Sequence, residues 1–237
     1  MRRSPALLLL LLLVACLVAP ASGAARTASE KKGALDRLAK LRTATALSLK
    51  GYSPRLYPHW LDPDRNGCDA REDTLIRDGT NVKRGPQCAI RSGIWVDQYS
   101  GRTYRAPRSL AADHLVPLAN AWRSGARRWT RARRTQYAND PLVLVVTSTQ
   151  LDRQKGNRSP GQWKPPSRGN WFAYAERWIR IKSKYHLAVT RSERAALQVM
   201  LNAEPANSVV PLIAGTTVVG STLTATSGSW TGSPVPT

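Results

Sequence analysis

The residues best suited to chemistry lie in the middle of the chain. Asp113 and His114 stand together at the end of an apolar run, and Asn139 follows further along. Asp152 comes shortly after a second apolar segment, residues 142–146. Carboxylate and amide oxygens are ligands that a hard divalent cation prefers, and a neutral imidazole suits a general base near pH 7. This arrangement predicts a site with one hard metal ion and one general base.

The same stretch resembles a known family. The resemblance is carried by D-H-L-V-P-L-A-N-A-W-R-S-G-A at residues 113–126, by Y-A-N-D-P-L at 137–142 and by R-Q-K-G at 153–156. These runs resemble an HNH (ββα-metal) endonuclease, and more narrowly the secreted bacterial branch related to the C-terminal domain of GmrSD-type restriction enzymes. An acid, a histidine and an amide recur together by chance, but the long run that begins at Asp113 is far more specific. The resemblance extends from about Gly51 to about Leu201.

The resemblance implies an α+β fold in which helices surround a small ββα-metal (HNH) core. Residues 143–146 would form the second strand of that core, and residues 148–156 its helix. Asp113 would be a metal ligand, and Asn139 would orient the loop that carries the histidine. His114 is the only histidine inside the motif, so it is assigned as the general base.

The third position of the motif departs from the family pattern. Relatives resemble N-R-x-K-G-D, whereas this chain reads D-R-Q-K-G-N over residues 152–157. Asp152 can still ligate a hard cation, most favourably Mg²⁺, with Mn²⁺ as the alternative. Its other interpretation is an acid that satisfies the dipole of a helix N-terminus. Lys155 or Arg153 could stabilise the pentavalent phosphate of a hydrolysis, and Arg153 is also a candidate contact to nucleic acid.

The chain is strongly basic. It carries 36 Lys and Arg against 15 Asp and Glu, which gives a formal charge of +21. Such a charge attracts polyanions, among them nucleic acid, anionic lipid and anionic wall polymer. The alternatives are a solvated basic surface and the bias of an arginine-rich genome. Because Arg dominates over Lys, bidentate phosphate contacts are favoured, and nucleic acid is the partner that we expect.

Arginines and tryptophans are interleaved in one segment with a helical pattern. The residues concerned are Trp122, Arg123, Arg127, Arg128 and Trp129. Aromatic rings among arginines suit phosphate binding combined with stacking on a base or sugar. The alternative is that the tryptophans belong to the core and the arginines form a solvated face. The three arginines are therefore candidate nucleic-acid contacts.

The N-terminus predicts an export signal over residues 1–25. A basic start precedes an apolar run, residues 6–19, that is too short and wrongly flanked for a stable membrane span. Small residues then offer a cleavage site, so free secretion is the preferred interpretation. A second interpretation is a lipoprotein signal, because Leu13–Cys16 resembles a lipobox and Cys16 would then carry a lipid anchor.

The cysteine count follows from export. Without Cys16, only Cys68 and Cys88 remain. In an exported protein an isolated pair indicates a disulfide, which here would pin the N-terminal region of the domain. Its loop of about 20 residues would stabilise the fold by roughly 3 kcal/mol on the chain-entropy account. The alternative is half of a zinc site, although no C-x-x-C motif or nearby histidine supports it.

An acidic loop precedes the first of these cysteines. D-P-D-R-N-G at residues 62–67, with Asp73 at the twelfth position, begins like an EF-hand calcium loop. Two features weaken this interpretation: the closing residue is Asp rather than the longer Glu, and Pro63 stiffens the turn. A hydrogen-bonded turn of the Asx type is the alternative that we favour.

Hydrophobic periodicity and turn signals predict the surrounding elements. We expect a flexible leader over 22–33, helices over 34–47 and 70–78, a hairpin with strands at 94–96 and 103–104, a helical segment over 118–138, and helices over 171–185 and 191–201. The last helix should begin with a capping box, Thr190 with Glu193. His59, beside Trp60, is expected to be packed or at the surface rather than a ligand.

The predicted organisation is a signal peptide (1–25), a leader with a short helix (26–50), an HNH nuclease-like domain (51–203), and a linker with an incomplete immunoglobulin-like β segment (204–237). We expect a secreted, metal-dependent endonuclease that cuts DNA, and RNA as a further substrate. Its sequence specificity should be low, since no sequence-reading module is evident. The alternative is a non-catalytic basic module that binds extracellular DNA or wall polyanions on a decayed nuclease fold.

Overall fold

The computed structural model describes residues 28–203, 206–209, 213–214, 224–225 and 229–231. Its helices are α1 (Ala28–Lys40), α2 (Ala70–Asp78), α3 (Leu118–Arg123), α4 (Arg131–Ala138), α5 (Thr149–Lys155), α6 (Trp171–Lys184) and α7 (Arg191–Leu201). Its strands are β1 (Gly79–Arg84), β2 (Ile90–Val96), β3 (Thr103–Tyr104), β4 (Leu110–His114), β5 (Leu144–Ser148), β6 (Ala206–Val209), β7 (Ile213–Ala214), β8 (Thr224–Ala225) and β9 (Ser229–Thr231). Single 3₁₀ turns are η1 (Pro54–Leu56), η2 (Pro86–Cys88), η3 (Pro107–Ser109), η4 (Ala126–Arg128) and η5 (Arg168–Asn170). The predicted α+β class is confirmed, while the expected signal peptide and Cys16 lie outside the described residues.

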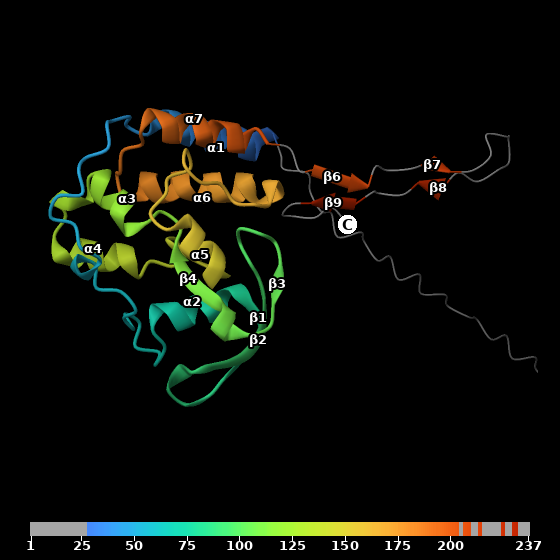
Figure 1. Cartoon of the computed structure of the whole chain (residues 1–237), viewed down its shortest axis with the longest axis horizontal. Coiled ribbons are helices and arrows are strands. Elements are labelled where there is room, and N and C mark those ends of the chain that lie inside the picture. Colours follow the sequence, from blue (N-terminus) through green and yellow to red (C-terminus); the bar gives the residue numbers. More distant parts are fainter. Residues whose placement is uncertain (1–27, 204–205, 210–212, 215–223, 226–228, 232–237) are drawn as a thin grey trace, which may run out of the picture.

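Three long helices form one side of the fold. α1 and α7 lie side by side over α6 (Figure 1). Leu38 of α1, Trp178 of α6 and Leu197 of α7 are buried together in the main core. The predicted helices over 171–185 and 191–201 are confirmed, and α7 begins with the expected capping box. In that box the Thr190 hydroxyl accepts from the Glu193 N–H, and the Glu193 carboxylate accepts from the Thr190 N–H.

The smaller sheets form the other side. β1, β2 and β3 make an antiparallel sheet in that order, and β4 pairs antiparallel with β5. Trp95 of β2 is fully buried in a second core with Leu75 of α2, Leu110 of β4 and Val146 of β5. The predicted hairpin is confirmed, with Trp95 opposite Tyr104, and β1 adds a strand that the sequence did not reveal.

A disulfide joins Cys68 and Cys88, whose Cα atoms are 5.2 Å apart. It ties the loop before α2 to the turn after β1. α2 itself starts at a capping box in which Asp69 accepts backbone N–H groups and Glu72 reaches back to the Asp69 N–H. Both the disulfide and the helix over 70–78 were predicted, and the pair lies next to the loop that leads into the site described below.

The prediction for the first helix was wrong at both ends. α1 begins at Ala28, inside the expected leader, and stops at Lys40 rather than at 47. Its buried stripe is Ala34 and Leu38, which face α6 and α7. After the helix the chain turns extended, because residues 42–44 pair with Val189 through backbone hydrogen bonds. Those tertiary hydrogen bonds replace the last helical turn that periodicity predicted.

The expected helical segment over 118–138 is interrupted. Gly125 has a φ of 135°, which ends α3, and Thr130 accepts the Arg133 N–H to start α4. Trp122 is buried, whereas Trp129 is partly buried. Both rings pack against other parts of the protein. The tryptophans therefore resemble core residues more than platforms on which a base could stack.

Beyond α7, β6 pairs with β9 and β7 pairs with β8. An immunoglobulin-like identity for this segment stays a prediction. Among the described residues, no helix is long and apolar enough to cross a membrane.

Candidate active site at the end of strand β4

Two paired strands and the helix after them bring the motif residues together. Asp113 lies opposite Val145 and His114 opposite Leu144 in the β4–β5 pair. α5 starts directly after β5 and packs on both strands. The helix begins where the Ser148 hydroxyl accepts the N–H of residue 151, a local N-cap. This return of the chain places Asp152 and Lys155 beside Asp113.

The Asp113 carboxylate is held from two directions. The ammonium of Lys155 lies 3.0 Å from Oδ1 and 2.7 Å from Oδ2 of Asp113. The Tyr99 hydroxyl donates to Oδ2 at 2.6 Å. Lys155 is fully buried and also donates to the backbone carbonyl of His114 at 3.0 Å. As placed, Lys155 fixes the end of β4, and a contact from it to a phosphate stays a prediction.

Asp152 adds a second carboxyl group at the same point. Burial, the negative charge of Asp113 and a hydrogen bond between the two carboxyl groups together raise its pKa to about 6, against the nearby charges of Lys155 and Arg153. The carboxylate of Asp113 is thus an unfavourable charge for the ionised form of Asp152. The group therefore has more negative charge than the lysine alone balances.

This donor set fits a hard divalent cation. Carboxylate oxygens are the ligands that Mg²⁺ takes, usually with several retained water molecules, so two protein carboxylates suffice for a site. A cation would also relieve the repulsion that raises the pKa of Asp152. Within the described residues, no cluster of three or more His, Cys, Asp or Glu side chains suited to a metal occurs. The residues thus fit a lightly ligated ion such as Mg²⁺ better than a closed cage.

His114 has the properties of a base. Its Nε2 lies 2.9 Å from the Ala138 carbonyl oxygen. A carbonyl can only accept, so Nε2 carries the proton and Nδ1 keeps its lone pair. Burial lowers the pKa of His114 to about 4, assisted by His59 and Lys155, while the Ala138 carbonyl and Asp113 oppose the shift. The imidazole is therefore neutral at pH 7 and able to accept a proton.

Asn139 lies at the end of α4, next to the residue that accepts from His114. Its Nδ2 donates to the carbonyls of Pro58 at 2.9 Å and Thr135 at 2.8 Å. Its Oδ1 accepts the Leu61 N–H at 2.9 Å. The side chain thus holds the segment 58–61 against α4. Its predicted role was to orient the loop that carries His114, which stays a prediction. The segment that it holds here is a different one, whose rings lie against His114.

The segment 58–61 brings His59 and Trp60 to the site. The sequence analysis did not assign either residue to it. The ring of His59 lies 5.8 Å from the ring of His114, and the ring of Trp60 lies 5.7 Å from it, centroid to centroid. His59 is packed, as expected, but its neighbour is the candidate base. The order P-H-W is separated from His114 by more than fifty residues of chain, so no local signal connects them.

Tyr99 and Asp97 were also missed. Asp97 is fully buried and accepts from the N–H groups of Tyr99, Ser100 and Ser148 and from the Thr147 hydroxyl. It thereby ties the β2–β3 turn to the start of α5 and aims Tyr99 at Asp113. A D-x-Y-S-G turn was visible in the sequence, but its burial was not.

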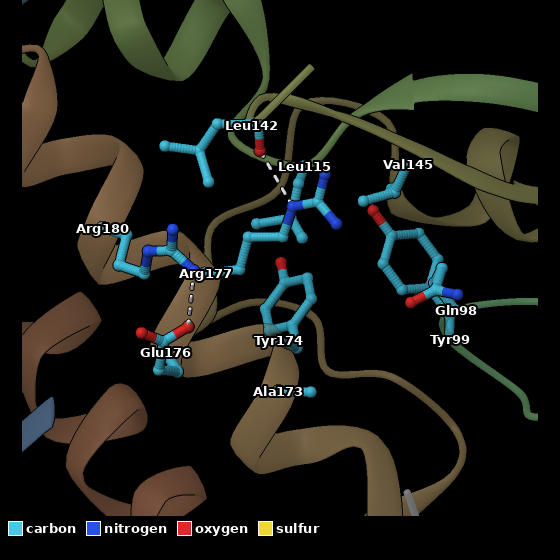
Figure 2. A pocket seen from close by; sticks show the side chains of 10 residues that line it. All are labelled: Gln98, Tyr99, Leu115, Leu142, Val145, Ala173, Tyr174, Glu176, Arg177 and Arg180. Carbon is cyan, nitrogen blue, oxygen red and sulfur yellow. Dashed lines mark hydrogen bonds and ion pairs between the residues drawn. The ribbon is translucent and has the colours of Figure 1, made fainter. Parts of the chain in front are cut away.

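A cavity of about 260 Å³ lies behind Tyr99 (Figure 2). Tyr99 and Tyr174 line it, and Arg177 donates from Nε to the Leu142 carbonyl at 2.8 Å. The Tyr174 hydroxyl is buried and has no hydrogen-bond partner in the described part of the chain. The predicted catalytic and metal residues do not line this cavity, but Tyr99, which does, donates to Asp113.

The candidate nucleic-acid residues fall into two places. Arg153 is exposed on α5, next to Asp152. Arg123, Arg127 and Arg128 are exposed on α3 and η4, and Nε of Arg123 donates to the Leu47 carbonyl. Arg153 therefore belongs to the site, whereas the other three belong to a separate surface.

The acidic loop at 62–67 closes on itself. Asp62 accepts the N–H groups of Asn66 and Gly67, and the Asn66 amide donates to Asp64 and Asp73. This is the hydrogen-bonded turn that we favoured over a calcium loop.

Comparison with known proteins identifies a family to which this chain is similar. A family profile described as "GmrSD restriction endonucleases, C-terminal domain" matches residues 71–199. A relative named "Uncharacterized secreted protein", from Arthroderma benhamiae, is 44% identical over 155 residues, which are 64% of this chain and 75% of the relative. No solved structure matches. The matched residues include β4, β5 and α5 in full, and the chain therefore belongs to the family of the GmrSD restriction endonuclease C-terminal domain.

Proposed function

We propose that the protein is a secreted, metal-dependent endonuclease that hydrolyses phosphodiester bonds of DNA with low sequence specificity. Membership in the GmrSD C-terminal family supports a nuclease-like role. The observation that carries the chemistry is the neutral imidazole of His114, with Nδ1 free, beside the carboxylates of Asp113 and Asp152. A base and a hard-cation site within one small unit are what phosphodiester hydrolysis requires.

We further propose that β4, β5 and α5 form the ββα-metal core of an HNH nuclease. In support, β4 ends in Asp113 and His114, β5 pairs with it antiparallel, and α5 returns Asp152 to Asp113. This chain has Asp152 where the family pattern has Asn. The aspartate keeps an oxygen donor and adds a negative charge, which favours binding of a divalent cation over water.

In this proposal each residue has a distinct role. Nδ1 of His114 takes a proton from the water that attacks phosphorus, because Nε2 is already committed to a carbonyl. Asp113 and Asp152 would hold Mg²⁺ or Mn²⁺, which neutralises charge on the phosphate and assists the leaving oxygen. Lys155 fixes Asp113 through the buried ion pair. Arg153, exposed beside Asp152, contacts the phosphate backbone.

Secretion rests on three observations. The relative from Arthroderma benhamiae is named a secreted protein. Residues 1–25 have the composition of an export signal. The Cys68–Cys88 disulfide is typical of proteins that fold in an oxidising compartment.

The test is cleavage of supercoiled plasmid by the mature protein in Mg²⁺, in Mn²⁺ and in EDTA. We expect cleavage only with metal, and a loss of about 10²–10⁴-fold in His114→Ala, the range for a general base. His186→Ala is the matched control, since His186 is exposed and away from the motif. It should cleave like wild type.

Two outcomes contradict the proposal in different ways. Cleavage that survives in His114→Ala would place the base elsewhere. Folded wild-type protein that binds DNA in a salt-dependent way and cuts it in no metal would favour the second candidate, a non-catalytic basic module. The specific observation behind that candidate is that Asp113 is already engaged by Lys155 and Tyr99.

A further inference from the structure

The His114 ring has two aromatic neighbours from one short segment. His59 meets it edge to face, with ring centroids 5.8 Å apart and planes at 89°. Trp60 lies 5.7 Å away with planes at 36°. His59 and Trp60 also pack on each other at 5.1 Å. The three rings form one cluster, which we call the ring cluster (His59, Trp60 and His114).

The segment that supplies His59 and Trp60 is held on both sides. Asn139 accepts from the Leu61 N–H and donates to the Pro58 carbonyl, so it clasps the residues just before and just after the two rings. Nδ1 of His59 donates to the Tyr57 carbonyl at 2.7 Å, which fixes the orientation of that ring. The pair is thus presented to His114 by a rigid backbone.

The backbone at Trp60 is in an unfavourable conformation. Its φ is 58°, in the left-handed region that bulky residues rarely adopt. Such a conformation is strained and persists only where the surrounding structure holds it. Here the hydrogen bonds of Asn139 hold the backbone on both sides of Trp60, and the indole packs against the ring of His114.

A hydrogen bond alone does not fix a histidine ring. The Ala138 carbonyl restrains Nε2 of His114, but the torsion that rotates the ring is broad. Packing against the ring faces and edges further restricts the plane in which the Nδ1 lone pair lies. His59 and Trp60 supply that packing.

We propose that His59 and Trp60 are positioning residues that set the plane of the His114 imidazole, and that Asn139 acts on catalysis through them. This inference rests on the nuclease function proposed above. Misplacement of a reacting group by about 1 Å costs on the order of 10²-fold in rate, so the loss of a ring wall is expected to lower kcat rather than to weaken substrate binding.

The kinetic test compares graded substitutions. Trp60→Ala should lower kcat by about 10²-fold with KM nearly unchanged, and Trp60→Phe, which keeps a ring, should recover most of the rate. His59→Phe should likewise retain most of the activity that His59→Ala loses. Trp171→Ala, a partly buried tryptophan outside the ring cluster, is the matched control and should leave kcat unchanged.

A spectroscopic measurement keeps this inference separate from the proposed function. In metal-free protein without DNA, the imidazole NMR signals of His114 should show one ring orientation in wild type and motional averaging in Trp60→Ala. That result is expected even if the protein cuts no nucleic acid, in which case only the nuclease proposal fails.

Three results would overturn the inference. The first is a Trp60→Ala protein that cleaves at the wild-type rate. The second is a rise in KM with kcat intact, which would make Trp60 a surface that contacts substrate. The third is a His59→Phe protein as impaired as His59→Ala, which would mean that the imidazole nitrogens of His59 act directly. Thermal unfolding of each variant, measured in parallel, corrects for any loss of folded protein.

Discussion

Lys155 and Lys182 are both completely buried, and they differ in the carboxylates that they face. The ammonium of Lys182 lies 3.3 Å from Glu193. It also donates to Asn120 Oδ1 at 2.6 Å, Ser124 Oγ at 2.6 Å and the carbonyl of residue 188 at 2.9 Å. Glu193 in turn accepts from Asn120. One positive charge meets one negative charge, and the polar atoms around them are paired.

Lys155 lies near two carboxyl groups rather than one. Its ammonium binds both carboxylate oxygens of Asp113, and Asp152 stands beside them with a pKa raised to about 6. The site therefore has one carboxyl group more than the lysine neutralises. The buried ion pair Lys182–Glu193 joins α6 and α7, whereas the unbalanced group at Lys155 is where we propose that a cation binds. The excess acid, and not burial of the lysine, distinguishes the candidate site.

The largest effect should come from Asp113→Asn, which removes the carboxylate that Lys155 binds most closely. Cleavage should fall by more than about 10³-fold if metal and base both depend on it. Breaking a buried ion pair costs about 3–5 kcal/mol, so the free energy of unfolding should fall as well. Chemical denaturation and plasmid cleavage check the two effects. A small stability loss would show that Asp152 replaces Asp113 as the partner of Lys155.

Lys182→Met should affect stability and leave chemistry intact. The substitution leaves Glu193 buried without its charge partner, at a cost of about 3–5 kcal/mol in the free energy of unfolding. The folded fraction should cleave at the wild-type rate, because Lys182 lies on α6, outside the site. Adding Glu193→Leu should restore part of the stability, since both charges are then gone. A loss of kcat in the folded single variant would show that Lys182 also supports the candidate site.

The stability difference between wild type and Lys182→Met should also depend on pH. Burial lowers the pKa of Lys182 to about 8, although Glu193 opposes the shift. An unfolded lysine titrates near about 10.4, so between these values the unfolded chain binds a proton that the folded chain has lost. The free energy of unfolding of wild type should therefore rise with pH across this window relative to Lys182→Met. Denaturation of both proteins at pH values from about 7 to 10 measures the difference.

Asp152→Asn tests whether the second carboxylate of the site holds the cation. It removes the excess carboxylate and restores the amide of the family pattern. Metal-free protein should be as stable as wild type or slightly more so, because a repulsion is relieved. We expect Mn²⁺ to raise the melting temperature of wild type and to raise that of the variant less, and cleavage should fall by about 10-fold. Equal stabilisation by Mn²⁺ in both proteins would show that Asp152 does not hold the ion.

The smallest effect should come from the arginines outside the site. Arg127→Gln with Arg128→Gln should lower the salt dependence of DNA binding, with a change in the log–log slope of about 2 if both contact phosphates. Arg102→Gln with Arg105→Gln carries the same charge change on exposed residues of the β2–β3 hairpin region and is the matched control. Equal slopes for the two double variants would mean that binding reflects net charge alone.

Local signals explain the successful predictions. α7 begins and ends at the predicted residues because Thr190 and Glu193 form a capping box, which operates within one turn of helix. α2 and the β2–β3 hairpin were likewise predictable from a cap and a turn. The failures occurred where distant contacts compete with local preference. α1 ends early because the next residues pair with Val189, and α3 ends at Arg123, just before Gly125, although the periodicity continues.

The sequence by itself determined the chemistry that is available: Asp113 and His114 at the end of a strand, Asp152 on the following helix, a cysteine pair and a large positive charge. These depend on residue type and short spacing. Only the tertiary structure decided that the Lys155 ammonium binds Asp113 and that His59 and Trp60 pack on His114. A long side chain can point to solvent or inward, and two segments can meet or miss, until the packing of the whole domain fixes their positions.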